Sequence, residues 1–413
     1  MPSIIIEHKK QHYLPNVTEP RAAELYALLR RRGGVRRGAL WNGFPTWVVF
    51  DDALARDCLR DPRLVNDARA VPDAPHGMPG ARYAGDLVSV LRNPLSSDGA
   101  EHRRLRASIT PLLSAQAVRR WAPVVQRTVD DVLRRLQATA HADLVVAFAR
   151  PVAETLAGEL IGIPESQRTR VLRLMRLLSS AAPPESPQMK AAATEVAHLL
   201  DEIANGAMER PGRGIAALLA DARLQGALHC QNELVDMLAA AVFAVLDSTT
   251  ATLSTGALYL LRDESARERL RAGGEEADSV IEEVIRLACP FPTSGYRFAT
   301  EPLRIGAARM ERGDIVCVSL LAANLDPAVW ADPLRVDPSR ALARHLSFGL
   351  GRHYCPGAAL GRMIVRSALK GLFALPGLRL TDLPGRAAPG QPYRYRQGIS
   401  RYPHRMPVLV GQR

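Results

Sequence analysis

Residues 346–362, LSFGLGRHYCPGAALGR, set one of the five cysteines of this 413-residue chain inside a glycine-rich turn. Gly349 and Gly351 precede the cysteine, Cys355, and they allow the backbone to turn sharply and to direct N–H groups toward the sulfur. The apolar spacing after Gly357 indicates that a helix begins there. A helix N-terminus stabilises a thiolate, the form of cysteine that binds metal. The pattern therefore indicates a metal ligand rather than a structural cysteine.

The other cysteines are far apart, and none belongs to a C-x-x-C pair: Cys58, Cys230, Cys289 and Cys317. This spacing argues against a disulfide framework or a structural zinc site and favours a reducing compartment, with the four serving as small buried hydrophobic residues. Cys355 has no second cysteine or histidine at metal-site spacing. A lone thiolate fits an iron already held by a macrocycle, with Phe348 shielding the sulfur and Gly357 admitting a large, flat group.

The charge of the chain is strongly positive but dispersed. The net charge of +12 at pH 7 comes almost entirely from arginine, and no run of like charge or aromatic-interleaved stripe marks a nucleic-acid surface. The first residues lack a signal-peptide core, and the longest apolar run, 238–246, ends at Asp247, well short of a membrane span. We therefore expect a soluble, cytoplasmic protein that binds neither nucleic acid nor membrane.

Helical periodicity dominates the chain from about 99 to 290. Short strand patterns flank this region, with a hairpin signature at 42–43 and apolar stretches around 295–318. Residues 70–97 are rich in proline and glycine and predict a loop of a length that is usually functional. Because no repeat or linker divides the chain, the sequence predicts one domain over 1–413, mainly α with small β-sheets.

The segment FGLGRHYCPG, residues 348–357, resembles the haem-binding loop of the cytochrome P450 family, F-x-x-G-x-x-x-C-x-G, at every specified position. The resemblance implies haem b as the cofactor and Cys355 as the axial ligand of its iron. The other residues of this loop that it implies as cofactor contacts are Phe348, Gly349, His353 and Gly357. It also implies the single-domain cytochrome P450 fold, in the soluble form of the bacterial members.

A second feature is the E-x-x-R pair Glu283 and Arg286, which lie one helical turn apart on a shared helix face. On its own such a pair is more often solvated and weak. In the family the pair is buried and bonds a third basic residue near the haem loop, and Arg340 matches that residue. The resemblance thus implies an ion network that fixes geometry more than it adds stability.

The segment EHRRLR, residues 101–106, resembles the H-x-x-x-R pattern of the family, in which His102 and Arg106 reach a haem propionate. One helical turn between the two lets both donors converge on one anion. Arg297 and His353 match two further propionate contacts of the family. The alternative for 101–106 is a basic helix face in water.

The helix expected at about 231–262 resembles the distal helix of the family, which carries A-G-x-[D/E]-T across the haem face. Here AVLDS at 244–248 retains the acid but has valine for glycine and serine for threonine. The resemblance implies a proton relay through Asp247 and Ser248, with Thr249 as the next candidate. The alternative is an ordinary buried helix whose hydroxyl groups bond back to the backbone.

The resemblance implies a haem-thiolate monooxygenase that hydroxylates or epoxidises a specialised metabolite with one atom of O2. Two alternatives remain: a P450 that couples or rearranges its substrate without inserting oxygen, which Val245 and Ser248 favour, and a non-catalytic haem-binding protein. The substrate is expected to be a small molecule, either free or bound to a carrier protein. Its walls are expected from the 70–97 loop, the helices flanking 181–187, residues 291–296 and residues 393–400.

No flavin or nicotinamide motif is recognisable, so the resemblance implies electrons from a separate ferredoxin and ferredoxin reductase. Four arginines flank the two segments expected on the cysteine side of the haem: Arg103, Arg104, Arg352 and Arg362. We expect them to form a docking patch for an acidic ferredoxin, because surface charges of this kind steer association. The protein is expected to be a monomer.

Overall fold

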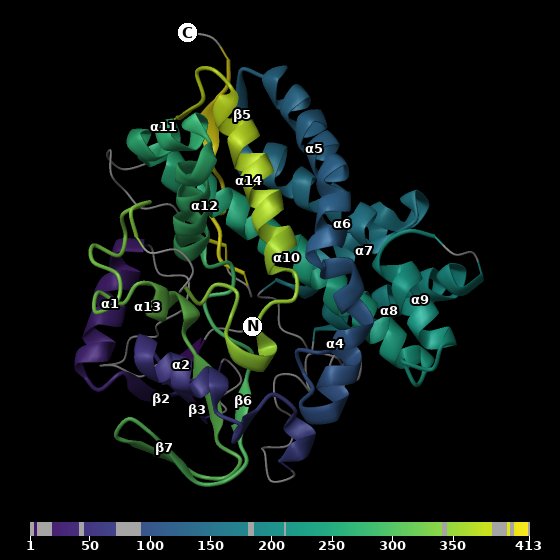
Figure 1. The fold of residues 1–413 in the computed structure, drawn as a ribbon, viewed down its shortest axis with the longest axis vertical. Helices are drawn as coiled ribbons and strands as arrows, with labels where there is room; N and C mark the ends of the chain where they lie inside the picture. Colours follow the sequence, from purple (N-terminus) through teal and green to yellow (C-terminus); the bar gives the residue numbers. More distant parts are fainter. Residues whose placement is uncertain are drawn as a thin grey trace.

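The computed structural model (Figure 1) describes residues 4–5, 19–40, 45–71, 92–180, 186–209, 212–340, 345–381, 395–396 and 400–411. Some of the expectations lie wholly or partly outside these ranges: the 42–43 turn, most of the 70–97 loop, and parts of the substrate walls at 181–187 and 393–400. Within the described ranges the chain is mainly α-helical with small β-sheets, which confirms the predicted fold class.

Helices form where the sequence supplies apolar periodicity and a capping residue. The Asp51 side chain, for example, accepts the Leu54 N–H at the start of α2, and Asp263 accepts the Ala266 N–H at the start of α11. The described α-helices are α1 (Glu19–Arg31), α2 (Asp52–Arg60), α4 (Gly99–Leu113), α5 (Ala115–Gln137), α6 (Arg150–Ile161), α7 (Glu165–Leu178), α8 (Pro187–Glu209), α9 (Ile215–Leu224), α10 (Gln231–Arg262), α11 (Glu264–Ala272), α12 (Gly274–Ala288), α13 (Leu320–Asn324) and α14 (Ala358–Ala374). Shorter pieces are the 3₁₀ turns η1 (Ala68–Ala70) and η3 (Gly351–His353) and the π-helix η2 (Val145–Ala149).

The long helix α10 is the centre of the fold and contacts α6, α8, α9, α12 and α14. Its residues 249–261 are all buried. Gly256 permits the close approach of α12, because a Cβ there would lie 2.5 Å from a methyl carbon of Val284. α10 is long and apolar enough to cross a membrane by length and composition, but a buried core helix of a soluble protein meets the same criterion.

The strands form small sheets around this helical core. The largest has the order β1-β2-β3-β9-β6-β4, in which β2 and β3 pair antiparallel on either side of the expected hairpin and β3 pairs parallel with β9. The other sheets have the orders β10-β11-β5 and β7-β8. The strand bounds are β1 (Ile4–Ile5), β2 (Val35–Leu40), β3 (Pro45–Val49), β4 (Leu64–Val65), β5 (His141–Asp143), β6 (Arg297–Ala299), β7 (Leu303–Ile305), β8 (Ala308–Met310), β9 (Ile315–Val318), β10 (Arg379–Leu380) and β11 (Pro407–Leu409).

The elements divide into a sheet-containing side and a helical side (Figure 1). α1, α2 and the six-stranded sheet lie on one side, α4 to α9 lie on the other, and α10, α12 and α14 run between them. Buried apolar side chains form two clusters, and Val245 in α10 packs against both. The branched side chain at this position is therefore part of the packing that joins the two halves.

Candidate active site

The cysteine loop is a tight turn held by its own backbone. Gly349 and Gly351 adopt positive φ angles of 71° and 74°, a region that side chains rarely enter. A Cβ on Gly351 would lie 2.9 Å from the carbonyl oxygen of Leu59 at the end of α2, so the loop also needs glycine for this close approach. The Cys355 N–H donates to the carbonyl of Phe348 at 2.8 Å, which closes the turn just before α14.

Burial and nearby positive groups have opposite effects on the pKa of the Cys355 thiol. Burial raises its pKa above the usual value, while a backbone hydrogen bond from Gly357 and the charge of Arg106 oppose that rise. One detail of the sequence prediction is wrong: the Gly349 N–H donates to the carbonyl of Leu346 at 2.8 Å rather than to the sulfur. The tight turn uses that amide to hold itself, and the N–H of Gly357 is the one that bonds the sulfur.

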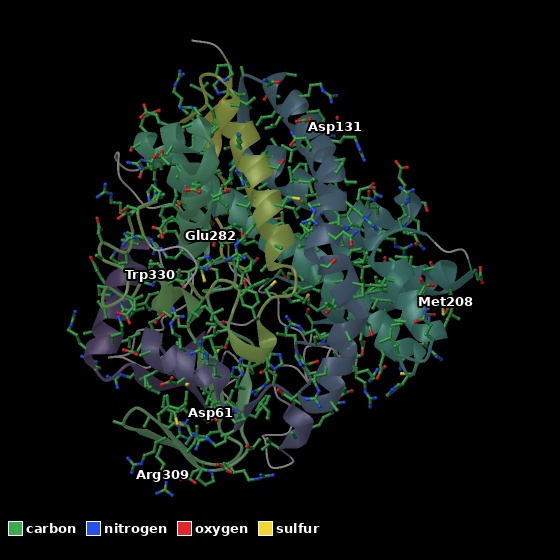
Figure 2. All side chains as sticks on the ribbon, viewed as in Figure 1. Asp61, Asp131, Met208, Glu282, Arg309 and Trp330 are labelled. Atoms are coloured by element: carbon green, nitrogen blue, oxygen red, sulfur yellow. The ribbon has the colours of Figure 1, made fainter. Side chains whose placement is uncertain are left out.

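Phe348 is fixed beside the loop by a cation and an ion pair. The Arg362 guanidinium lies 4.5 Å from the centre of its ring. Arg362 in turn donates to both carboxylate oxygens of Glu282, at 2.6 and 3.0 Å. Figure 2 labels Glu282 on α12, next to α14, which carries Arg362. The ring of Phe348 is therefore held in one place, as a residue that shields a buried sulfur needs to be.

Two of the predicted propionate contacts carry buried nitrogen atoms that have no hydrogen-bond partner among the described residues. His102 is 5% exposed, and its Nε2 has no hydrogen-bond partner among the described residues. Arg297 is 2% exposed; it donates from Nη1 to the carbonyl of Leu64 at 3.3 Å, but its Nε has no partner in the described part of the chain. Unpaired buried donors are costly. An anion that accepts from these nitrogens would remove that cost, so the two residues fit haem propionates.

The charge states of these residues follow from their surroundings. Burial, together with the charges of His353 and Arg106, lowers the pKa of His102 to about 4. His102 is therefore neutral at physiological pH and presents one N–H donor. Burial and the charge of Arg352 lower the pKa of Arg297 to about 10, which leaves it positive. A neutral donor and a cation both suit an anionic carboxylate.

His353, the third predicted contact, already has protein partners on both ring nitrogens. Its Nδ1 lies 3.1 Å from the carbonyl of Pro94, and its Nε2 lies 3.1 Å from Asp98. Asp98 also accepts from Arg352 at 3.0 Å. Burial alone would raise the pKa of Asp98, but the hydrogen bonds from His353 and from backbone N–H groups hold it at about 2. His353 can therefore contact a propionate through Nε2 only if it gives up its hydrogen bond to Asp98. Arg106, the fourth, donates to the carbonyl of Arg352 at 3.1 Å.

The three residues of the expected ion network lie together. Arg286 is fully buried and donates to both oxygens of Glu283, at 2.7 and 2.8 Å, and Arg340 donates to the same carboxylate at 3.0 Å. The remaining Arg286 donors bond carbonyl groups, those of Asn324 and Pro333 at 2.8 Å and that of Arg335 at 3.2 Å. The guanidinium also lies 4.9 Å from the centre of the Trp330 ring (labelled in Figure 2). Every charge has a partner, which is the condition for tolerating such a network in a core.

The polar residues in the middle of α10 point in different directions. Asp247 is 2% exposed and accepts a hydrogen bond from Ser400 at 3.2 Å, and burial raises its pKa. Ser248 is partly exposed and shares a helix face with the exposed Ala244, to whose carbonyl its hydroxyl donates. Thr249 is buried. The Ser248 hydroxyl therefore follows the alternative given for this helix, in which hydroxyl groups bond back to the helix backbone.

Three of the four arginines expected in the docking patch are paired with carboxylates, and the patch itself stays a prediction. Arg104 donates to both oxygens of Glu233, at 2.7 and 2.8 Å, and Arg352 and Arg362 pair with Asp98 and Glu282 as described above. Arg103 is exposed. The three bound arginines hold secondary-structure elements together because carboxylates from distant segments neutralise them.

Sequence reasoning missed Asp98, Glu282 and Arg396. Asp98 is the residue before α4, and its position ahead of an acidic first turn was a usable signal for a carboxylate near His102. Glu282 is adjacent to the E-x-x-R pair, but nothing in the sequence links it to Arg362. Arg396 acts on Asp247 electrostatically from a segment that was expected only as a substrate wall.

The comparisons with known proteins agree with this geometry. A model of the cytochrome P450 family matches residues 213–373. Nocardicin C N-oxygenase of Nocardia uniformis subsp. tsuyamanensis is 30% identical over 395 residues, covering 93% of this chain and 94% of that protein. The tirandamycin C-bound P450 monooxygenase TamI superposes with a TM-score of 0.85 at 28% identity, covering 95% of this chain and 98% of that one. CxnD, a P450 for C–S bond formation in chuangxinmycin biosynthesis, superposes with a TM-score of 0.83 at 27% identity, covering 98% and 99%. The chain belongs to the cytochrome P450 family, whose members bind haem iron, and it is similar to bacterial oxidoreductases of secondary metabolism.

Proposed function

We propose that the protein is a monooxygenase that inserts one atom of O2 into a small secondary metabolite by hydroxylation or epoxidation. The observation that carries the proposal is the pairing of the Cys355 loop with the buried, unpartnered nitrogen atoms of His102 and Arg297. A thiol alone, or two unpaired donors alone, would be ambiguous. Together they supply a ligand for the iron and partners for the carboxylates of one haem b.

The residues have separate tasks in holding the cofactor. Cys355 ligates the iron, and the N–H of Gly357 together with nearby arginine charge favours its thiolate form. His102 and Arg297 pair with the propionates, and Arg106 adds positive charge beside them. When bound in this way, haem supplies the oxygen-activating chemistry.

Proton supply falls to the middle of α10. Because burial raises the pKa of Asp247, its protonated form persists to higher pH than that of an exposed aspartic acid. Asp247 can therefore hold a proton behind the helix, while the Ser248 hydroxyl lies on the partly exposed face beside Ala244. We propose that Asp247 takes up protons from the solvent side and that Ser248 orients water on the open face.

The partners follow from the family and from what the sequence lacks. We propose that a ferredoxin and a ferredoxin reductase deliver the electrons, and that the protein works as a soluble monomer in the cytoplasm. Because three of the four expected docking arginines are ion-paired, the ferredoxin is not assigned to that patch.

The test has a spectroscopic and an isotopic arm. The reduced carbon monoxide complex is expected to show the red-shifted Soret band of a thiolate-ligated haem, and turnover under ¹⁸O2 is expected to leave one labelled atom in the product. Absence of the red-shifted band would contradict the cofactor assignment. A product without label, formed by a protein that shows the band, would contradict oxygen insertion alone.

A second candidate function is oxidative bond formation without oxygen insertion. Val245 favours it, because a valine that packs against both hydrophobic clusters stands where the family usually has glycine. The similarity to CxnD, which is named for C–S bond formation, supports the same candidate. The ¹⁸O2 experiment separates the two functions.

A further inference from the structure

A cavity of about 490 Å³ lies apart from the cysteine loop, where β5, η2, the first residue of α6 and the tail around 396–405 meet. Its volume is within the range of small-molecule binding sites. Val146 and Ala147 form an apolar wall, and Arg150, Arg396, Arg405 and Tyr402 are among the polar residues that line the rest. Neither the haem nor the proton relay proposed above uses this cavity.

The cavity holds more positive than negative charge. Its one carboxylate, Asp143, accepts the backbone N–H groups of Val145 and Met406 at 3.0 Å each and lies 3.5 Å from Arg405. Within the described residues no carboxylate pairs with Arg150, and its Nε is buried without a hydrogen-bond partner. Arg150 is thus a cation that lines the cavity and has one buried donor that no described residue accepts.

The second arginine, Arg396, is also held by neutral groups. It donates to the hydroxyl of Tyr402 at 2.7 Å and to the carbonyl of Arg176 at 3.2 Å. Burial lowers the pKa of Arg176, and the charges of Arg150 and Arg396 lower it further. Arg150 and Arg396 therefore each repel Arg176, which is ion-paired with Glu154, and an anion bound at Arg150 and Arg396 would offset that repulsion.

The apolar wall comes from an unusual piece of backbone. Val145–Ala149 is a π-helix, a rare conformation that is frequent at functional sites. It leaves Val146 51% exposed, although the neighbouring Val145 and Phe148 are fully buried. A large exposed apolar side chain beside Arg150, which no carboxylate of the described residues pairs, suits a ligand with an apolar body and an anionic head.

We propose that this cavity binds a small organic carboxylate, with its head between Arg150 and Arg396 and its apolar body against Val146 and Ala147. A carboxylate matches the planar donor fork of arginine. Inorganic phosphate fits less well, because it lacks an apolar body and its second charge would face Asp143. The cavity is thereby assigned as a site for a monoanionic amphipathic molecule.

The position of the site points to a role in turnover. Arg396 bounds the cavity, and its charge opposes the rise that burial causes in the pKa of Asp247. A carboxylate bound to Arg396 would offset part of that charge and so change how Asp247 holds its proton. This effector role rests on the proposed function, whereas the binding site itself does not.

Binding is tested by calorimetry on the full-length, haem-loaded protein, with hexanoate as the probe and phosphate and hexanol as comparators. Hexanoate is expected to bind at one site without shifting the Soret band, since the cavity lies apart from the cysteine loop. Phosphate and hexanol are each expected to bind at least about tenfold more weakly, because each lacks one half of the interaction. Equal binding of phosphate or hexanol would overturn the proposal.

Variants locate the site. Arg150→Gln removes a proposed partner of the head group and is expected to weaken hexanoate binding about tenfold. Arg405→Gln is expected to weaken it by a similar factor, because Arg405 lies 3.5 Å from Asp143 and offsets the charge of that carboxylate in the cavity. The Arg405 side chain is 65% exposed, so its variant remains informative if Arg150→Gln fails to fold. Arg309→Gln is the matched control, because Arg309 is an exposed arginine on β8, at the end of the molecule opposite β5 (Figures 1 and 2). Unchanged affinity in Arg405→Gln, or equal loss in Arg309→Gln, would overturn the assignment.

The effector role is tested in the same proteins. Hexanoate at the concentration that half-saturates the wild type is expected to change the rate of product formation clearly in the wild type and in Arg309→Gln, but much less in Arg405→Gln, whose site is then mostly empty. A rate that responds equally in all three proteins would show that hexanoate acts elsewhere and would overturn the effector role. No response in a wild type that binds hexanoate would also overturn it.

Discussion

The cysteine loop and the middle of α10 differ in how their polar groups are satisfied. Beside the loop, His102 and Arg297 keep buried nitrogen atoms that no described residue bonds. In the middle of α10, the hydroxyl groups of Ser248, Thr250 and Thr252 donate to carbonyls of their own helix, in the case of Thr250 to Leu246 at 2.8 Å. An anionic ligand would satisfy the nitrogen atoms of the first region, whereas these three hydroxyls are already satisfied within the helix. The unsatisfied nitrogens therefore point to a ligand, and the hydroxyl positions by themselves do not.

The largest effect is expected from removing the thiol. Cys355→Ala deletes the group proposed to ligate the iron, so the red-shifted band of the reduced carbon monoxide complex should be lost. Cys230→Ala, which removes an exposed cysteine, is the control and should retain the full band. Difference spectra at equal haem content make the measurement. A persistent band in Cys355→Ala would show that Cys355 is not the ligand of the haem iron.

The next largest effect concerns the ion network that supports the loop side. Glu283→Ala leaves Arg286 buried without its carboxylate, which is expected to lower the free energy of unfolding by about 3–5 kcal/mol. The control is Glu311→Ala, which breaks an exposed pair with Arg309 at 2.9 Å and should change that free energy by less than about 1 kcal/mol. Urea unfolding of both variants measures the difference. If both variants lose a similar free energy of unfolding, the buried network stabilises the protein no more than an exposed ion pair does.

The parts of the site that could be predicted from sequence are those set by local pattern. Positive φ at Gly349 and Gly351 is a property of a short loop, and the shared face of Glu283 and Arg286 follows from helical spacing. The family resemblance added Arg340, which lies where it was expected. These features depend on neighbours in the chain or on a motif with fixed spacing.

The parts that could not be predicted depend on carboxylates brought from far away. Arg352 meets Asp98, which lies 254 positions earlier, and Arg362 meets Glu282, 80 positions earlier. Nothing in a sequence spacing reports such pairs, so both arginines were expected in a surface patch. The same limit applies to Asp247, whose partner Ser400 lies in the C-terminal tail.

A third effect should separate cofactor binding from protein stability. Arg297→Leu removes a buried cation whose Nε has no partner in the described residues, so the haem-free protein should be at least as stable as the wild type. The same change removes a charge-assisted contact to a propionate, so haem should dissociate about ten- to a hundredfold faster. Haem transfer to an acceptor protein and urea unfolding of the apoprotein measure the two quantities. Slower or unchanged haem loss would exclude Arg297 as a propionate partner.

A fourth effect is a pH dependence in the haem-free protein. The pKa of His102 is lowered to about 4, so the unfolded chain binds a proton at its ordinary pKa, near 6.5, that the folded chain takes up only at lower pH. Stability should therefore fall as pH decreases through this window, and it should fall less steeply in His102→Gln. Urea midpoints between pH 4 and 7 measure the slope. Parallel slopes in the two proteins would show that His102 is not held neutral.

The smallest effect is expected on the oxygen side. Because the Ser248 hydroxyl donates to the carbonyl of Ala244, Ser248→Ala removes a group that is already bonded to its own helix. We expect the fraction of electrons lost as hydrogen peroxide to rise only about two- to fivefold, well below the roughly hundredfold effect of a dedicated proton donor.

Asp247→Asn should mainly slow turnover, since a buried group that holds a proton for transfer is replaced by one that cannot exchange it. Thr250→Val is the control, because its buried hydroxyl bonds the carbonyl of Leu246 and takes no part in the proposed relay. Product formed per NADH consumed, with peroxide assayed in parallel, gives both quantities. If Ser248→Ala and Asp247→Asn both match the wild type, these side chains are not the relay, Thr249 becomes the next residue to test, and bond formation without oxygen insertion gains support.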